Sequence, residues 1–252
     1  MSINIFKKDN QANGNFNNGE ILEKKPIGFP QDGGQLKPYS NLFYWAHAWA
    51  PNDDSVIGLH PHRGFEICSF VLKGEIEHYD TLLDKWITLR KGDVQIIKAG
   101  KGVSHSEKLK GGSEIFQIWF DPNIIESLYV DPVYNDFKSE CFSIENKDGV
   151  DIKTISNKEN QIGLDSYGIQ IFEYSYYDGT YSHTIEQNSY HSLFVMSGNL
   201  IINNQEIKKG DFVIIDNEKD LSLLTSNKCK FFEIISPITP PYKTYAEIHK
   251  IN

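Results

Sequence analysis

The sequence predicts an all-β protein made of two barrels, and three observations lead to this fold class. Many short apolar runs are separated by turns that contain glycine, which is typical of sandwiches and barrels. Aromatic residues make up 13% of the 252 residues, which suits pleated, half-buried surfaces, and the chain has no apolar heptad pattern. A weak internal repeat divides the strand-like runs into two sets.

The internal repeat pairs two short motifs of the first half with two motifs of the second. Residues 70–74 are echoed by residues 194–198, and residues 91–97 are echoed by residues 209–215. Two copies of one barrel, of the double-stranded β-helix or jelly-roll type, are the economical explanation. The predicted organisation is an N-terminal barrel over residues 1–130, a connecting segment over 131–165, and a C-terminal barrel with a tail over 166–252.

Strand-like runs follow one another closely in the first copy. Residues 41–50 form the first strong run, in which Phe43 and Trp45 share one face by parity and Tyr44 lies on the other. The Phe43 and Trp45 face is typical of a core, and one of its rings is a candidate to line a pocket for a flat ligand. Further strands are expected over residues 66–72, 75–80, 86–89, 94–97, 103–107 and 115–120. A short helix is expected near residues 121–126.

Four residues in two of the strand-like segments form a candidate metal site. Residues i and i+2 of a strand share a face, so His60 and His62 project to one side, as do His105 and Glu107. A lone His-X-His pattern is more often a pair of surface histidines, and the second pair favours the metal site. Three imidazoles and one carboxylate suit Fe(II), and also Mn, Co, Ni, Cu or Zn. An octahedral ion with four protein ligands keeps positions for substrate or dioxygen.

Two comparisons within the sequence qualify this ligand set. Glu66, four residues after His62, is an alternative ligand or an acceptor for a ligand imidazole. At the equivalent offsets the second copy has Thr184, Glu186, Leu223 and Thr225, so we expect its barrel to be without metal. The remaining histidines have no partner at ligand spacing and are expected to be structural: His47, His78, His183, His191 and His249.

The composition argues against two classes of partner. The formal net charge is -9 and no tract is rich in Lys and Arg, so binding to nucleic acid phosphates is not expected. No apolar run approaches the roughly 18 residues that a membrane helix needs. The three cysteines, Cys68, Cys141 and Cys229, lack CxxC spacing, which fits reduced thiols and a cytoplasmic location.

With these residues in hand, the chain resembles the pirin family of the cupin superfamily. Residues 60–66 and 92–107 carry the resemblance, together with the Gly74-Glu75 turn and His78, and the likeness covers about residues 40–120. The resemblance implies a bicupin with a metal, usually iron, in the N-terminal barrel only. It places that metal on the residues already singled out as ligands: His60, His62, His105 and Glu107.

The resemblance also implies two functions. Some pirins have quercetin 2,3-dioxygenase activity, so we expect a flavonol-like or other enolic substrate, with Glu107 as the general base for its hydroxyl proton. Mammalian pirin is a nuclear transcriptional co-regulator, so the alternative is a metal-dependent binding module that contacts a protein partner. A metal-assisted isomerase that needs no dioxygen is a third reading.

Overall fold

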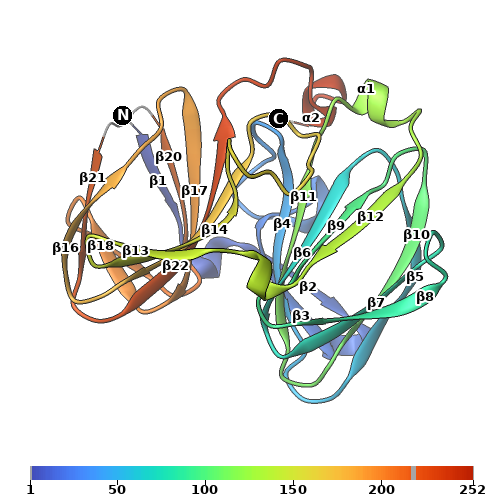
Figure 1. Ribbon diagram of the computed structural model, residues 1–252, viewed down its shortest axis with the longest axis horizontal. Coiled ribbons are helices and arrows are strands. Elements are labelled where there is room, and N and C mark those ends of the chain that lie inside the picture. Colours follow the sequence, from blue (N-terminus) through green and yellow to red (C-terminus); the bar gives the residue numbers. More distant parts are fainter. Residues whose placement is uncertain (1, 217–219, 252) are drawn as a thin grey trace. The chain divides into compact units, whose positions relative to one another are not determined.

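The computed structural model describes residues 2–216 and 220–251, which form two compact β units (Figure 1). In its described residues, the N-terminal barrel consists of Gln11–Cys141, Leu164–Ser166 and residues 241–251, and the C-terminal barrel of residues 2–10, Phe142–Gly163, and residues 167–216 and 220–240. The predicted all-β class with two barrels is confirmed. A search of the described helices finds none with the length and apolar character needed to cross a membrane.

Two antiparallel sheets face each other in the N-terminal barrel. The larger has the order β12 (Val133–Phe137), β9 (Val94–Lys98), β6 (Glu66–Lys73), β11 (Glu114–Phe120), β4 (Leu42–Trp49), β3 (Ile21–Ile27) and β2 (Ala12–Phe16). The smaller has the order β5 (Ser55–His62), β10 (Val103–Leu109), β7 (Glu75–Asp80) and β8 (Lys85–Arg90). Side chains from both sheets, among them Ile76, Leu89 and Ile115, form a fully buried apolar core.

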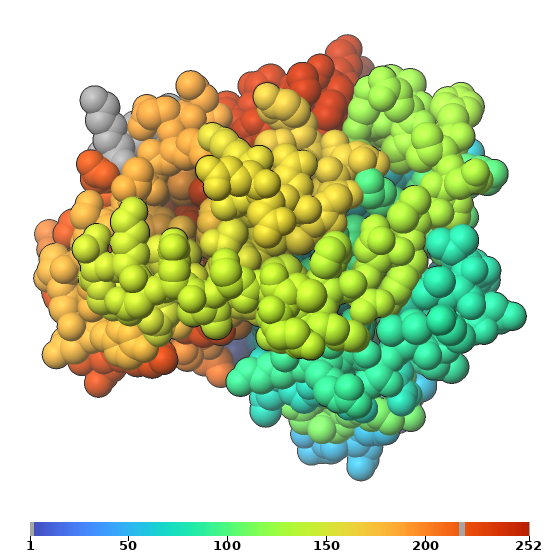
Figure 2. All heavy atoms as spheres, viewed as in Figure 1, coloured from blue at the N-terminus to red at the C-terminus, as the bar shows by residue number. Residues whose placement is uncertain are grey.

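The C-terminal barrel has two sheets of the same sizes. The larger has the order β1 (Ser2–Phe6), β20 (Phe212–Asp216), β17 (Ser189–Ser197), β22 (Cys229–Pro237), β15 (Gln170–Tyr176), β14 (Val150–Ser156) and β13 (Ile144–Lys147). The smaller has the order β16 (Gly179–Thr184), β21 (Asp220–Thr225), β18 (Asn199–Ile202) and β19 (Gln205–Lys208). The edge strand β13 lies at the surface of its barrel, where all four of its residues are exposed (Figure 2).

The two sheet orders match position by position, which explains the internal repeat of the sequence. β6 and β17 hold the same place in the larger sheets, and β5 and β16 the same place in the smaller ones. The first edge strands differ in origin. β12 follows β11 along the chain, whereas its counterpart β1 comes from the start of the chain.

The Lys-Gly-Asp turn of each copy ends in an aspartate that secures this first edge strand. Asp93 accepts a hydrogen bond of 2.9 Å from the backbone N–H of Ser139, just after β12. Asp211 accepts one of the same length from the backbone N–H of Lys8, just after β1. The lysine that precedes Ser139 or Lys8 also forms an ion pair with that aspartate. The repeated turn therefore has the same structural role in both copies.

The barrels have bounds that differ from the predicted domain ranges. The strand β1 belongs to the C-terminal barrel, and Pro241–Asn252 belongs to the N-terminal barrel. The predicted connecting segment 131–165 is divided, because β12 pairs with β9 in one barrel while β13 pairs with β14 in the other. The pairing of strands that are distant in sequence determines to which barrel a segment belongs. The local hydrophobic period carries no information about this pairing.

Short helices complete the chain outside the sheets. Among the described residues, the α-helices are α1 (Ile124–Ser127) and α2 (Tyr245–Ile248), and single 3-10 turns lie at Lys8–Asn10, Asn17–Gly19, Pro30–Asp32 and Ser139–Cys141. α1 lies at the end of the helix expected near residues 121–126. Thr244 caps α2 in a capping box with Glu247. The carboxylate of Asp121 accepts a hydrogen bond from the backbone N–H of Tyr245, so it fixes the tail on the N-terminal barrel.

Candidate metal centre

Three of the four predicted metal ligands form a compact cluster in the N-terminal barrel. His60 on β5 lies directly opposite His105 on β10, and His62 follows two residues later on the same face. The Nε2 atoms of His62 and His105 are 2.8 Å apart, and those of His105 and His60 are 2.9 Å apart. The ligand atoms of all three lie within 4.8 Å of one another, so they could hold a metal ion.

The strand β5 supplies two of these imidazoles from the edge of its sheet. Pro61, between them, has no N–H to donate, and an edge strand tolerates it because one side of the strand has no partner. β10 lies between β5 and β7, which buries His105 completely. The cluster thus has two half-buried histidines toward one side and one fully buried histidine behind them.

The protonation of the cluster suits a cation. Burial, and the proximity of the other imidazoles, lower the pKa of His62 to about 3 and that of His105 to about 2. His60 Nδ1 lies 2.8 Å from the carbonyl oxygen of Gly58. Because a carbonyl oxygen only accepts hydrogen bonds, the ring N–H at Nδ1 is the donor. Its Nε2 therefore presents a lone pair to the cluster, as the neutral imidazole of a metal ligand does. These residues fit a divalent metal.

Glu107 lies beside this cluster but is not a member of the group of atoms within 4.8 Å among the described residues. Its carboxylate accepts a hydrogen bond of 2.6 Å from the Gln117 amide and one of 3.3 Å from the Ser69 hydroxyl. The pairing of β10 with β5 shifts register between His105 and Glu107. The extra residue of this irregularity lies in β5, so Glu107 keeps the same face of β10 as His105. Its hydrogen bonds to Gln117 and Ser69 of the facing sheet hold its carboxylate outside the group of three imidazoles.

The carboxylate of Glu66, the alternative ligand, is hydrogen-bonded to another segment of the same barrel. Its carboxylate accepts hydrogen bonds from the backbone N–H groups of Asp165 and Ser166 at 2.7 and 2.9 Å, and from the Ser166 hydroxyl at 2.6 Å. Burial raises its pKa, and these hydrogen bonds oppose the increase. Glu66 therefore holds the segment Leu164–Ser166 on the N-terminal barrel.

A cavity of about 350 Å³ opens beside the cluster within the N-terminal barrel. Its polar lining comes from His60, His62, Glu107, Gln117 and Glu23, and its aromatic lining from Phe16, Phe29, Tyr44 and Trp119. Volumes of this size are typical of small-molecule sites. Sequence reasoning did not find Glu23, because a single acidic residue in a strand carries no motif.

The aromatic strand β4 turns to this cavity the face opposite to the one that was a pocket candidate. Tyr44 and Ala48 line the cavity, whereas Phe43 and Trp45 do not. Trp45 is completely buried against Phe116, with ring centroids 5.6 Å apart. Parity along the strand separates the two faces, and the side that faces the cavity depends on how the sheets close.

The C-terminal barrel contains a second group of potential ligand atoms, which sequence reasoning missed. His183 Nε2 and His191 Nδ1 lie 3.0 and 2.8 Å from Glu233 Oε1, and all three residues are buried. The two imidazoles hold the pKa of Glu233 well below its usual range despite complete burial. The residues come from three strands, β16, β17 and β22, so no pair shows ligand spacing in the sequence.

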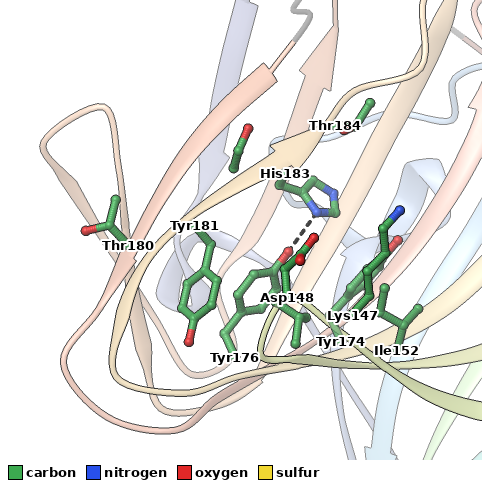
Figure 3. Close-up of a pocket in the computed structure, with 11 residues that line it drawn as sticks. Lys147, Asp148, Ile152, Tyr174, Tyr176, Thr180, Tyr181, His183 and Thr184 are labelled. Carbon is green, nitrogen blue, oxygen red and sulfur yellow. Dashed lines mark hydrogen bonds between the residues drawn. The ribbon is translucent and has the colours of Figure 1, made fainter.

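A cavity of about 530 Å³ adjoins this group, lined by strands that correspond to those around the cavity of the N-terminal barrel. Figure 3 shows His183 at this cavity, with its ring bonded to the Tyr176 hydroxyl at 2.9 Å and the rings of Tyr174 and Tyr181 nearby. The lining includes neither His191 nor Glu233. Of the second group, His183 therefore reaches the cavity, whereas His191 and Glu233 lie outside its lining.

Part of the chain is similar in sequence to known proteins. A family model described as Pirin matches residues 28–120. The chain is 35% identical to a pirin-like protein of Arabidopsis thaliana over 109 residues, which cover 41% of this chain and 34% of the relative. It is 38% identical to the quercetin 2,3-dioxygenase of Escherichia coli over 79 residues, which cover 28% of this chain and 34% of the relative. The matches thus span about a third of each of these curated relatives.

A solved structure extends the likeness of fold to nearly the whole chain. The bacterial pirin YhhW of Escherichia coli, in complex with nickel(II), matches with a TM-score of 0.77 and 20% identity, over 94% of this chain and 99% of that one. The family match itself lies in the barrel that contains the histidine cluster. The recognition of the family from sequence is confirmed, and the chain carries a pirin-family domain over residues 28–120.

Proposed function

We propose that the chain is a metal-dependent dioxygenase that acts on a flavonol-like or other enolic substrate in the cavity of the N-terminal barrel. The observation that carries the proposal is that two clustered imidazoles, His60 and His62, open into one cavity together with Glu107. The aromatic lining suits a flat substrate. The name of the Escherichia coli relative, quercetin 2,3-dioxygenase, supports the reaction type.

The proposed metal ligands are His60, His62, His105 and Glu107, and the proposed metal is Fe(II). The ligand types suit Mn, Co, Ni, Cu and Zn as well. When bound, such an ion orients an enolic substrate with dioxygen and stabilises the anion of the substrate. Glu107 joins the three imidazoles only after a shift of its side chain, because its carboxylate is bonded to Gln117.

The side chains around the cluster have defined roles in this proposal. Glu107 accepts the proton of the enolic hydroxyl as general base, since its carboxylate lies in the cavity wall. Gln117 orients that carboxylate through its amide, and its own carbonyl accepts a hydrogen bond from the Trp119 indole N–H at 3.1 Å. The aromatic rings exclude water from the reacting groups.

Oxygen consumption with quercetin and a panel of other enols tests the proposal. We expect His105→Ala to lose both bound metal and turnover. His47→Ala is the matched control, because that histidine pairs with Glu114 outside the cavity, and it should keep both. Turnover of an enol by protein stripped of metal would contradict the mechanism.

The same measurements address the alternative, a metal-dependent regulatory module that binds a protein partner. Such a module would bind metal but consume no dioxygen with any enol. For the cellular location we propose the cytoplasm, since Cys68, Cys141 and Cys229 are all free thiols and reduced cysteines are usual there.

A further inference from the structure

Glu23 is a buried carboxyl group in the wall of the cavity that the proposed mechanism does not use. It lies on β3, on the same side of the strand as the fully buried Ile21, and is 7% exposed. It and Glu107 are the two acidic residues in the described lining, which includes neither Lys nor Arg. Away from the histidine cluster, the ionisable group that a ligand would meet in this lining is therefore the carboxyl group of Glu23.

The chain makes room for this carboxyl group with a glycine. Gly14 on β2 lies directly opposite Glu23. A Cβ at Gly14 would lie 2.3 Å from Glu23 Oε2 and 2.7 Å from Lys25 Cε, closer than real contacts allow. A side chain at this position would therefore have to displace the ends of the Glu23 and Lys25 side chains.

Lys25 fixes one oxygen of Glu23 and leaves the other weakly bonded. Its ammonium lies 3.3 Å from Glu23 Oε2 and 3.0 Å from the Asp32 carboxylate, so one cation is shared by two acids. Glu23 Oε1 accepts a hydrogen bond of 3.4 Å from the Tyr44 hydroxyl, which is long for an O–H donor. Burial raises the pKa of Glu23, although Lys25 opposes the increase. Oε1 has acceptor capacity left for a ligand.

Aromatic rings on this side of the cavity define the shape of that ligand. The rings of Phe29 and Tyr44 stack at 4.7 Å, and the ring of Trp119 meets that of Phe29 edge-on at 5.3 Å. All three line the cavity. Flat faces with carboxyl acceptors favour a neutral aromatic molecule that carries hydroxyl groups, and they disfavour an anion, which would meet like charge.

We propose that Glu23 is a specificity-determining residue, whose carboxyl group accepts a hydrogen bond from a hydroxyl of a neutral, polyhydroxylated aromatic substrate while the enolic end of that substrate reaches the histidine cluster. This inference rests on the proposed function and adds to it the residue that selects among its substrates by their hydroxyl groups. A site built to accept a hydroxyl discriminates strongly against analogues that lack it, because its buried acceptor is then unpaired.

Anaerobic binding of two flavonols to the metal-loaded protein tests this assignment without turnover. Quercetin carries several hydroxyls, whereas 3-hydroxyflavone keeps only the enolic one. We expect Glu23→Gln to weaken quercetin about tenfold and to leave 3-hydroxyflavone nearly unchanged, since a hydrogen bond to a charged group has this magnitude. Glu23→Asp, which keeps the charge beside Lys25 but shortens the reach, should give the same selective loss and serves if the amide fails to fold.

Asp32→Asn is the matched control. It removes the other acid bonded to Lys25, and Asp32 does not line the cavity, so the ratio of the two affinities should stay as in the unaltered protein. The assignment of Glu23 is overturned if its substitutions weaken both flavonols equally or neither, or if Asp32→Asn gives the same selective loss. Failure of the unaltered protein to bind either flavonol would overturn the proposed function as well.

Discussion

The backbone N–H of Glu186 donates a hydrogen bond of 2.7 Å to Nε2 of His191, and this contact shows which nitrogen of a buried imidazole is the acceptor. Because Nε2 accepts this hydrogen bond, the ring hydrogen lies on Nδ1. The Nδ1–H group donates a hydrogen bond of 2.8 Å to Glu233. A metal ligand would need a lone pair on Nδ1, and its other nitrogen would normally be a donor. The hydrogen bonds of His191 therefore favour a hydrogen-bonded group over a metal site at His183, His191 and Glu233.

The first prediction concerns the metal content of the two barrels. Protein reconstituted with a divalent ion and freed of excess should bind a single equivalent by elemental analysis, and His105→Ala should remove it. His183→Gln should leave the content unchanged, because His191 of the same group presents an N–H, and not a lone pair, to Glu233. A second equivalent that disappears in His183→Gln would contradict this account of the C-terminal barrel.

The second prediction separates a structural role of Glu66 from metal binding. Glu66→Gln replaces an acceptor of three hydrogen bonds with an amide whose NH₂ faces donors, so we expect the free energy of unfolding to fall by about 1–3 kcal/mol. Urea denaturation measures this loss. Metal content should stay the same. A variant that lost the metal while keeping its stability would make Glu66 the ligand instead.

The third prediction compares two glycines near the same cavity. Gly14→Ala should lower stability by about 1–3 kcal/mol, because the added Cβ collides with Glu23 and Lys25. Gly58→Ala is the control, since a Cβ there has nothing within 4 Å, and its melting temperature should match that of the unaltered protein. Equal melting temperatures for the unaltered protein and both variants would contradict this prediction, because the Glu23 and Lys25 side chains would then move aside with no loss of stability.

The fourth prediction concerns pH and the attachment of the tail. Burial raises the pKa of Asp121 to about 7, and its Oδ1 has no hydrogen-bond partner. The folded state therefore binds this proton more tightly than the unfolded chain, and Asp121 contributes stability that is lost as pH rises from about 4 to about 7. In Asp121→Asn, the free energy of unfolding should fall by roughly 2–4 kcal/mol less over this pH range than in the unaltered protein, as measured by denaturation at several pH values. An identical pH profile for the variant would contradict the raised pKa.

The parity of two short motifs was enough to predict the three-histidine cluster. His60 and His62 lie on one face of β5, and His105 lies directly opposite His60. Parity also places Glu107 on the same face of β10 as His105, but it could not predict where the carboxylate of Glu107 is held. That carboxylate accepts hydrogen bonds from Gln117 and Ser69 of the facing sheet, and these contacts depend on how the two sheets pack rather than on either segment alone.

The group in the C-terminal barrel shows a limit of comparing repeats by offset. Offsets transfer positions on β5 and β10 to β16 and β21, but the group draws one residue from each of β16, β17 and β22. Register places Glu233 opposite Leu193, the position that Gln117 holds opposite Ser69 in the other barrel. The same place in the barrel thus carries an amide in one copy and an acid in the other.

The placement of β1 has a consequence for synthesis on the ribosome. This strand precedes the N-terminal barrel along the chain, yet its partner β20 is translated only after the strands of that barrel. The segment that completes the N-terminal barrel, residues 241–251, follows the strands of both barrels. A nascent chain arrested between β11 and β20 would therefore expose an unfinished N-terminal barrel and a strand β1 that lacks β20.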